Sequence, residues 1–188
     1  VVAPNLAKLG IRGYRAVLPD SGYTYFNMDD PVVGGMTPDK VALRRAISLG
    51  IDIDREINVV RRGQAIPAQS PMLPHTSGYD PAFKSAMSDY DPARAKALLD
   101  MYGYVDQDGD GWRDLPDGKA LVLEIATQPD QNSRQFDELW KLNMKAIGLR
   151  TRFAAGQWPE QLKQANAGKL MMWTLGGTAA SPDGQDGL

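Results

Sequence analysis

The chain has 188 residues, the size of one ordinary domain, and its 43% hydrophobic and 23% charged residues are typical of a globular protein. A formal net charge of −2 argues against a nucleic-acid surface and a polybasic membrane anchor. No apolar run approaches the roughly 20 residues that cross a bilayer. The chain contains no cysteine, which excludes disulfides, thiolate metal sites and cysteine nucleophiles.

The first half of the chain predicts two strands, two helices and a long loop. Aromatic and β-branched residues flank the turn sequence PDSG, and Pro38 begins a segment with a broad apolar face. Asp54 is a candidate N-cap for the short helix that follows. Prolines without periodicity predict an ordered loop over 64–90. The expected elements are strands over 12–18 and 23–28 and helices over 38–51 and 55–62.

The second half predicts alternating helices and strands. Asp91-Pro92 is a helix start, because an N-cap residue precedes proline at the first helical position. Asn132 or Ser133 begins a later helix with one apolar stripe. The alternation predicts an α/β layer with some parallel pairing. The expected elements are helices over 93–102, from 132 onward and over 158–168, and strands over 121–127, 149–154 and 169–175.

The sequence DQDGDGWRDLPDG at 106–118 resembles the start of a calcium-binding loop. An EF-hand loop needs oxygen ligands at positions 1, 3, 5, 7, 9 and 12 and a glycine at position 6, which Gly111 supplies here. A strand rather than a second helix follows, so the alternative is an Asp/Gly turn whose carboxylates bond nearby amides. In either case we expect only a structural role. The candidate ligands are Asp106, Asp108 and Asp110, with Asp114 and Asp117 at positions 9 and 12.

Signatures of catalysis are weak in this chain. His75 is the only histidine, which excludes a two-histidine metal site, and no GxSxG elbow accompanies it. The glycine pairs at 34–35 and 176–177 stand outside GxGxxG and P-loop patterns. We therefore expect no catalysis and no cofactor. The alternatives that stay open are a fragment of a hydrolase and an interaction module stapled by calcium.

The order of several short motifs is more informative than any one of them. The run over roughly residues 20 to 188 resembles extracellular solute-binding proteins of family 5, which serve peptide, nickel and related ABC importers. In that family the DGDG stretch is a turn before a strand, which favours the turn interpretation. The motifs are YFNM at 25–28, Leu43-Arg44-Arg45-Ala46, Ile53-Asp54-Arg55-Glu56-Ile57, Gly63 with Ala65 and Pro67, Tyr90-Asp91-Pro92, Arg94-Ala95, Leu98-Leu99, Gly103-Tyr104 and the DQDGDG turn.

The resemblance implies an α/β fold, a mixed sheet flanked by helices, that forms one lobe of a type II periplasmic binding protein. Residues 1–188 would be a single C-terminal lobe excised from a two-lobe protein, with 1–22 and 176–188 near the hinge crossings. A peptide or another small solute would bind between the lobes and pass to the membrane permease of an ABC importer. The resemblance implies a monomer in the periplasm or outside the cell, membrane-associated through the importer and without nucleic acid.

The crossing segments supply the candidate ligand-binding residues. Tyr23, Tyr25 and Asn27 alternate along a strand and therefore point together, although half-buried core tyrosines would show the same pattern. The later segment resembles the family stretch in which a tryptophan and an aspartate approach the ligand. Aligning Pro182-Asp183 with that stretch places Gly177 at the position of the tryptophan and Ala180 at the position of the aspartate. In peptide receptors that aspartate pairs with the α-amine of the ligand, so ordinary peptide binding is in question. The candidates in this segment are Trp173, Gly176, Gly177 and Asp183.

Four arginines are expected on helix surfaces or in packing contacts rather than in contact with the ligand. They are Arg44, Arg45, Arg61 and Arg62.

Overall fold

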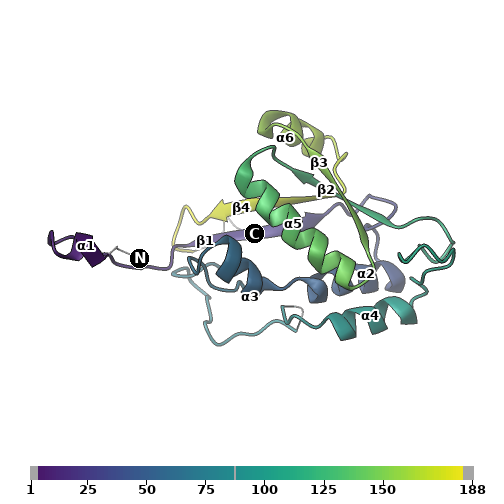
Figure 1. Ribbon diagram of the computed structural model, residues 1–188, viewed down its shortest axis with the longest axis horizontal. Coiled ribbons are helices and arrows are strands. Elements are labelled where there is room, and N and C mark those ends of the chain that lie inside the picture. Colours follow the sequence, from purple (N-terminus) through teal and green to yellow (C-terminus); the bar gives the residue numbers. More distant parts are fainter. Residues whose placement is uncertain (1–3, 87, 184–188) are drawn as a thin grey trace.

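A computed structural model describes residues 4–86 and 88–183 and shows a four-stranded mixed sheet in the order β1–β4–β2–β3 (Figure 1). β2 pairs in parallel with both β3 and β4, whereas β1 pairs antiparallel with β4. The expected mixed α/β sheet is thus confirmed. The strands are β1 (Asp20–Phe26), β2 (Val122–Thr127), β3 (Arg150–Ala155) and β4 (Met172–Thr178).

The longer helices begin where the sequence predicts. The Asp91 carboxylate accepts a hydrogen bond from the Arg94 N–H, which confirms this N-cap, and Asp130 rather than Asn132 or Ser133 caps α5. The helices are α1 (Pro4–Ala7), α2 (Pro38–Gly50), α3 (Ile53–Arg55), the π-helix η1 (Glu56–Val60), α4 (Pro92–Met101), α5 (Gln131–Ala146) and α6 (Trp158–Asn166).

The two faces of the sheet bury different amounts of apolar surface. The larger core packs α2, α4 and α5 against the face that carries Leu123, Ile125 and Met172. Alternate residues of the same strands point to the other face, where Ala126 and Trp173 form a smaller cluster beneath α6. Helices therefore cover one face broadly, and α6 covers only part of the other.

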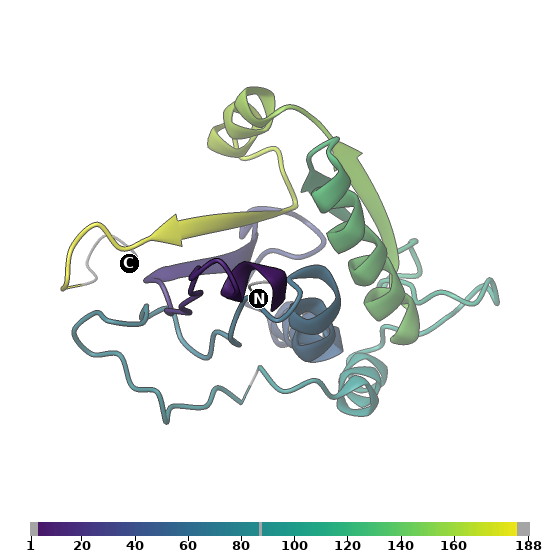
Figure 2. The ribbon, with the colours of Figure 1, turned by 60° about the vertical axis from the view of Figure 1, so that its left-hand side comes forward.

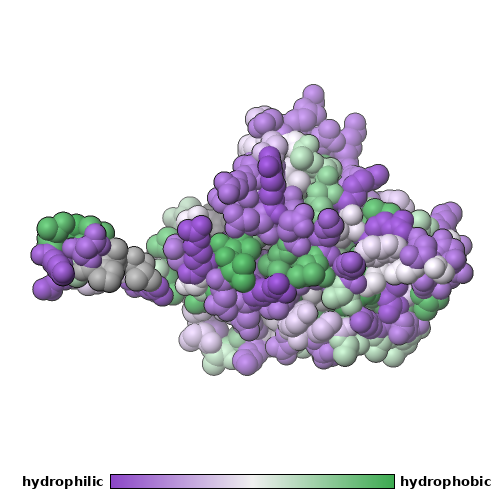
Figure 3. Space-filling model, viewed as in Figure 1, coloured by the Kyte–Doolittle hydropathy of each residue, from purple (hydrophilic) through white to green (hydrophobic). Residues whose placement is uncertain are grey.

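The predicted strand over 12–18 is wrong. Residues 11–18 contain no helix or strand, and the side chain of Tyr14 is 86% exposed. The segment leads from α1, which projects from the body in Figure 1, and Figure 3 shows apolar side chains on this projection. A strand needs a neighbouring strand to satisfy its backbone groups, and in the described part of the chain no strand pairs with this segment.

Three other elements shift relative to the prediction. β1 begins at Asp20, so the expected PDSG turn is part of a strand. The short helix begins at Ile53, and Asp52 rather than Asp54 caps it. β4 covers 172–178 instead of 169–175, because pairing of Phe26 with Met172 sets its register against β1.

Candidate functional site

The carboxyl ends of the parallel strands form one edge of the sheet. β2 ends at Thr127 and β3 at Ala155, and α5 and α6 begin just beyond them. β4 continues past this edge, because Ala126 is opposite Trp173 while β4 runs on to Thr178. Ligands of open α/β sheets bind outside the carboxyl ends of the strands. A ligand site is therefore expected at this edge.

β4 has a free edge beyond Trp173. Its odd-numbered residues exchange backbone bonds with β1, as the 2.9 Å bonds from Asn27 N to Met171 O and from Ala179 N to Pro19 O show. The alternate residues direct their N–H and C=O groups away from β1. Within the described residues, β2 pairs only with 172–173, so the backbone groups of two exposed residues farther along β4 have no strand partner on this side. These residues are Gly176 and Thr178.

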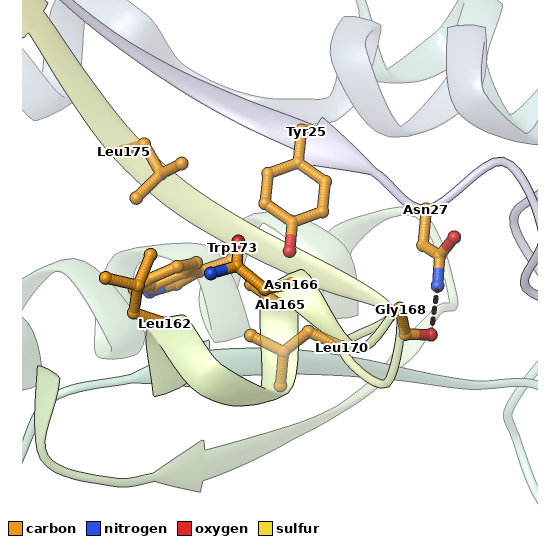
Figure 4. A pocket seen from close by; sticks show the side chains of 9 residues that line it. All are labelled: Tyr25, Asn27, Leu162, Ala165, Asn166, Gly168, Leu170, Trp173 and Leu175. Carbon is orange, nitrogen blue, oxygen red and sulfur yellow. Dashed lines mark hydrogen bonds between the residues drawn. The ribbon is translucent and has the colours of Figure 1, made fainter. Parts of the chain in front are cut away.

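Figure 2 shows α6 on one side of the paired strands β1 and β4. A pocket of about 270 Å³ lies between this helix and the two strands (Figure 4). Most of its wall is apolar, and two asparagines supply amide groups. Figure 4 shows the Tyr25 hydroxyl directed toward α6 and Trp173 lying between the strand and the helix. The lining residues are Tyr25, Asn27, Leu162, Ala165, Asn166, Gly168, Leu170, Trp173 and Leu175.

The structure brings three of the predicted ligand residues to this pocket. Trp173 is 2% exposed and Tyr25 is half-buried, and burial raises the pKa of the Tyr25 phenol. Asn27 lies at the end away from the carboxyl edge, where its Nδ2 donates a 2.9 Å hydrogen bond to Gly168 O. Tyr23 pairs with Leu175 nearer the carboxyl edge and is 52% exposed. Among the three residues predicted on β1, Tyr23 is thus the most accessible to a solute.

The remaining predicted residues lie along or beyond the end of β4. Gly176 is opposite Gly22, and Gly177 is opposite Ser21. Asp183 is exposed, accepts a hydrogen bond from Ser181 Oγ and does not line the pocket. The carbonyl of its neighbour Pro182 accepts a 2.7 Å bond from the Ser77 N–H, which ties this segment to the loop after η1. Ala180 is also exposed.

Trp158 is a candidate that sequence reasoning missed. Its ring lies 4.8 Å from that of Trp173, centroid to centroid, yet its side chain is 44% exposed at the carboxyl edge. Gln161, one turn later, donates to the carbonyls of Thr127 and Ala154 and so fixes α6 to two strand ends. The sequence did carry a signal for this residue. Trp158 is the first residue of the helix that follows the parallel strand β3, and such positions lie at the carboxyl edge of a sheet.

The DQDGDG segment forms a turn held by its own carboxylates. Asp106 accepts hydrogen bonds from Gly109 N and Gly111 N, and Asp108 accepts one from Asp110 N. The Asp110 carboxylate forms an ion pair with the Arg150 guanidinium instead. The Trp112 backbone N–H and this guanidinium lower the pKa of Asp110. Carboxylate oxygens of Asp106, Asp108 and the buried Asp114 lie within 4.8 Å of one another. These three, rather than the predicted Asp106, Asp108 and Asp110, would hold a calcium ion, and calcium binding stays a prediction.

Comparison with known proteins establishes the family. Residues 3–188 match the description "Bacterial extracellular solute-binding proteins, family 5 Middle". The chain belongs to this family. Di/tripeptide-binding protein 2 of Pseudomonas aeruginosa (strain UCBPP-PA14) is 31% identical over 148 residues, which are 77% of this chain and 26% of that protein. The family 5 chain thus spans about a quarter of the length of this curated relative.

Solved structures show the same fold. The oligopeptide-binding protein OppA matches 88% of this chain and 26% of its own, with a TM-score of 0.75 at 26% identity. A dipeptide-binding protein from Pseudoalteromonas sp. SM9913, in complex with Met-Leu, matches 97% of this chain and 34% of its own, with a TM-score of 0.72 at 24% identity. The expected type II periplasmic binding protein fold is confirmed, and the chain corresponds to part of a lobe. Members of family 5 are binding proteins rather than enzymes.

Proposed function

We propose that this chain is the ligand-binding lobe of an ABC importer's substrate-binding protein. A peptide or another small solute is captured between this lobe and a second one, and is then delivered to the permease in the membrane. The family description "extracellular" supports a place outside the cytoplasmic membrane. No helix within 4–86 and 88–183 has the length and apolar character of a membrane span.

The main support for this proposal is the free edge of β4. An extended peptide could hydrogen-bond to the backbone groups of Gly176 and its neighbours and so add a strand to the sheet. That strand would lie directly ahead of the end of β2, with the exposed Trp158 on the α6 side. Main-chain bonds would supply affinity, and the flanking side chains would supply selectivity.

The antiparallel ribbon of β1 and β4 is the connection to the second lobe in this proposal. It passes beyond the other strands, and residues 4–22 and 176–183 would lead toward the hinge crossings predicted near 1–22 and 176–188; residues 1–3 and 184–188 lie outside the described part of the chain. Closure of two rigid lobes about such crossings buries a ligand between them. The chain by itself would supply one wall of the cleft and should bind weakly or not at all.

A proline substitution in the full-length protein tests the role of the β4 edge. Gly176→Pro removes the N–H that faces the free edge but no bond to β1. Gly176→Ala keeps this N–H, and its Cβ would come no closer than 3.6 Å to Ser21 O. Isothermal titration with trialanine should show binding at least about tenfold weaker for Gly176→Pro, or about 1.4 kcal/mol, and nearly unchanged for Gly176→Ala.

The two parts of the proposal fail differently. Equal affinities of wild type and Gly176→Pro would contradict binding along β4 while leaving peptide capture intact. A wild-type protein that gives no heat with trialanine, and carries no co-purified peptide in native mass spectrometry, would contradict the peptide ligand. A co-purified sugar or metal chelate would keep the receptor function and change the ligand class.

A further inference from the structure

His75, the only histidine of the chain, makes a specific contact far from it in the sequence. Its ring Nε2 lies 2.8 Å from the carbonyl oxygen of Val17. A carbonyl oxygen only accepts hydrogen bonds, so Nε2 carries the proton in this contact. His75 also has a φ of 68°, in the left-handed region that is unfavourable for residues other than glycine. Such a conformation persists only where the surrounding structure holds it in place.

The turn that carries His75 is anchored to the body of the lobe. Leu73 and Thr76 are both buried, and Leu73 O accepts bonds from Thr76 N at 3.2 Å and from Thr76 Oγ1 at 2.7 Å. His75 and Ser77, on either side of Thr76, are exposed. The 73–77 turn therefore has a buried base and two residues on its outer side.

These two outer residues contact the two ends of the β1–β4 ribbon. Val17, bound by His75, precedes the start of β1. The Ser77 N–H donates a 2.7 Å bond to Pro182 O, past the end of β4. The Ala179 N–H donates a 2.9 Å bond to Pro19 O, so the entering and leaving segments also bond to each other. One turn thus holds both segments just outside the ribbon.

Residues 12–16 are much less restrained than their neighbours. They form no helix or strand and are exposed throughout. Within 4–86 and 88–183 no hydrogen bond reaches them, and the bond from His75 is the only one to Val17. A segment with exposed backbone and few contacts has low local stability. The chain therefore changes from held to free at Val17.

We propose that the 73–77 turn braces both crossing segments and thereby places the entering hinge at residues 12–16, an inference that rests on the proposed two-lobe receptor. Hinges are a few residues that absorb changes in φ and ψ while packed parts on each side move as rigid bodies. The brace makes Val17 and Pro182 move with this lobe. Bending is then confined to a shorter segment, so the second lobe samples fewer orientations before a solute arrives.

Trypsin cleavage of the full-length protein tests the brace, because Arg12 and Arg15 both lie in the free segment. Trypsin draws residues on both sides of the cut bond into its site, so cleavage after Arg15 requires Val17 to detach, whereas cleavage after Arg12 does not. His75→Asn removes the imidazole, and asparagine tolerates a left-handed φ. Cleavage after Arg15, relative to Arg12, should be at least about threefold faster than in wild type, as expected for one lost hydrogen bond.

A matched control and a second measurement complete the test. Ser77→Ala keeps the N–H that binds Pro182 and should be cleaved like wild type. Pulsed electron paramagnetic resonance then reports the distance between the lobes, with one spin label at Lys96→Cys, an exposed position on α4, and one on the second lobe. Without solute, His75→Asn should give a broader distance distribution than wild type, and trialanine should narrow both.

The outcomes separate this inference from the proposed function. An unchanged cleavage ratio in a folded His75→Asn protein, checked by circular dichroism, overturns the brace. Faster cleavage after Arg15 with an unchanged distance distribution overturns the role of the brace at the hinge. If wild type neither binds trialanine nor changes its distance between lobes, the peptide-receptor function fails, while the cleavage ratio still decides whether the turn holds Val17.

Discussion

The two halves of the sheet are built differently. β2 and its surroundings bury Leu123, Ile125 and Ile147 almost completely in the core under α2 and α5. The outer part of the β1–β4 ribbon instead carries exposed glycine and threonine residues, such as Gly176 and Thr178. Stability is therefore concentrated in the half where the chain contacts itself. The other half leaves backbone groups of β4 without a strand partner in the described residues, and an added strand could bind there.

Truncating one leucine in each half should show the largest contrast. Leu123→Ala should lower the free energy of unfolding by about 3 kcal/mol, because Leu123 is fully buried in the central strand. Leu175→Ala in the ribbon should cost less than about 1 kcal/mol, because this side chain is only partly buried. Urea denaturation followed by circular dichroism measures both. Similar losses of unfolding free energy at the two positions would contradict the inference that stability is concentrated around β2.

Adding a methyl group should separate a crowded glycine from an open one. A Cβ on the buried Gly34 would lie 2.4 Å from Met28 O, so the backbone must move, and we expect Gly34→Ala to cost roughly 2–3 kcal/mol. A Cβ on Gly177 would meet nothing within 4 Å, so Gly177→Ala should be neutral or slightly stabilising. Thermal melts of both variants test this. A stable Gly34→Ala protein would contradict the tight packing before α2.

A buried tyrosine should make stability depend on alkaline pH. Burial raises the pKa of Tyr104 to about 12 from an ordinary value of 10.0. Between these values the unfolded chain loses the proton and the folded chain keeps it, so stability falls as pH rises, by up to roughly 2 kcal/mol. Tyr104→Phe should flatten this decline, as urea denaturation at about pH 9 and about pH 12 would show. Tyr23→Phe in the ribbon is the control and should leave the decline in place.

The smallest contrast concerns two helix N-caps. Asp91 accepts a 2.8 Å hydrogen bond from Arg94 N, so Asp91→Ala should cost about 1 kcal/mol. Thr37 precedes α2 without a side-chain cap bond, so Thr37→Ala should change stability by only a few tenths of a kcal/mol. Urea midpoints resolve the difference. Equal effects would mean that the Asp91 bond is not formed in solution.

The sequence by itself determined what depends on neighbours along the chain. Pro38 and the Asp91-Pro92 pair set helix starts, because capping and the fixed φ of proline act within one turn. The Asp106 and Asp108 turn followed from local side-chain bonding, and the alternation of elements predicted the α/β class. The order of motifs also indicated the family, which the comparisons confirmed.

Only the tertiary structure decided which segments meet. Residues 12–18 have strand-forming side chains but pair with no strand among the described residues, and β4 took its register from β1 rather than from its own apolar run. Trp158 and Arg61 looked like ordinary helix residues until the fold brought one to Trp173 and the other to Gly22. The physical reason is that strand pairing and side-chain burial depend on residues far apart in the sequence, so local patterns cannot specify them.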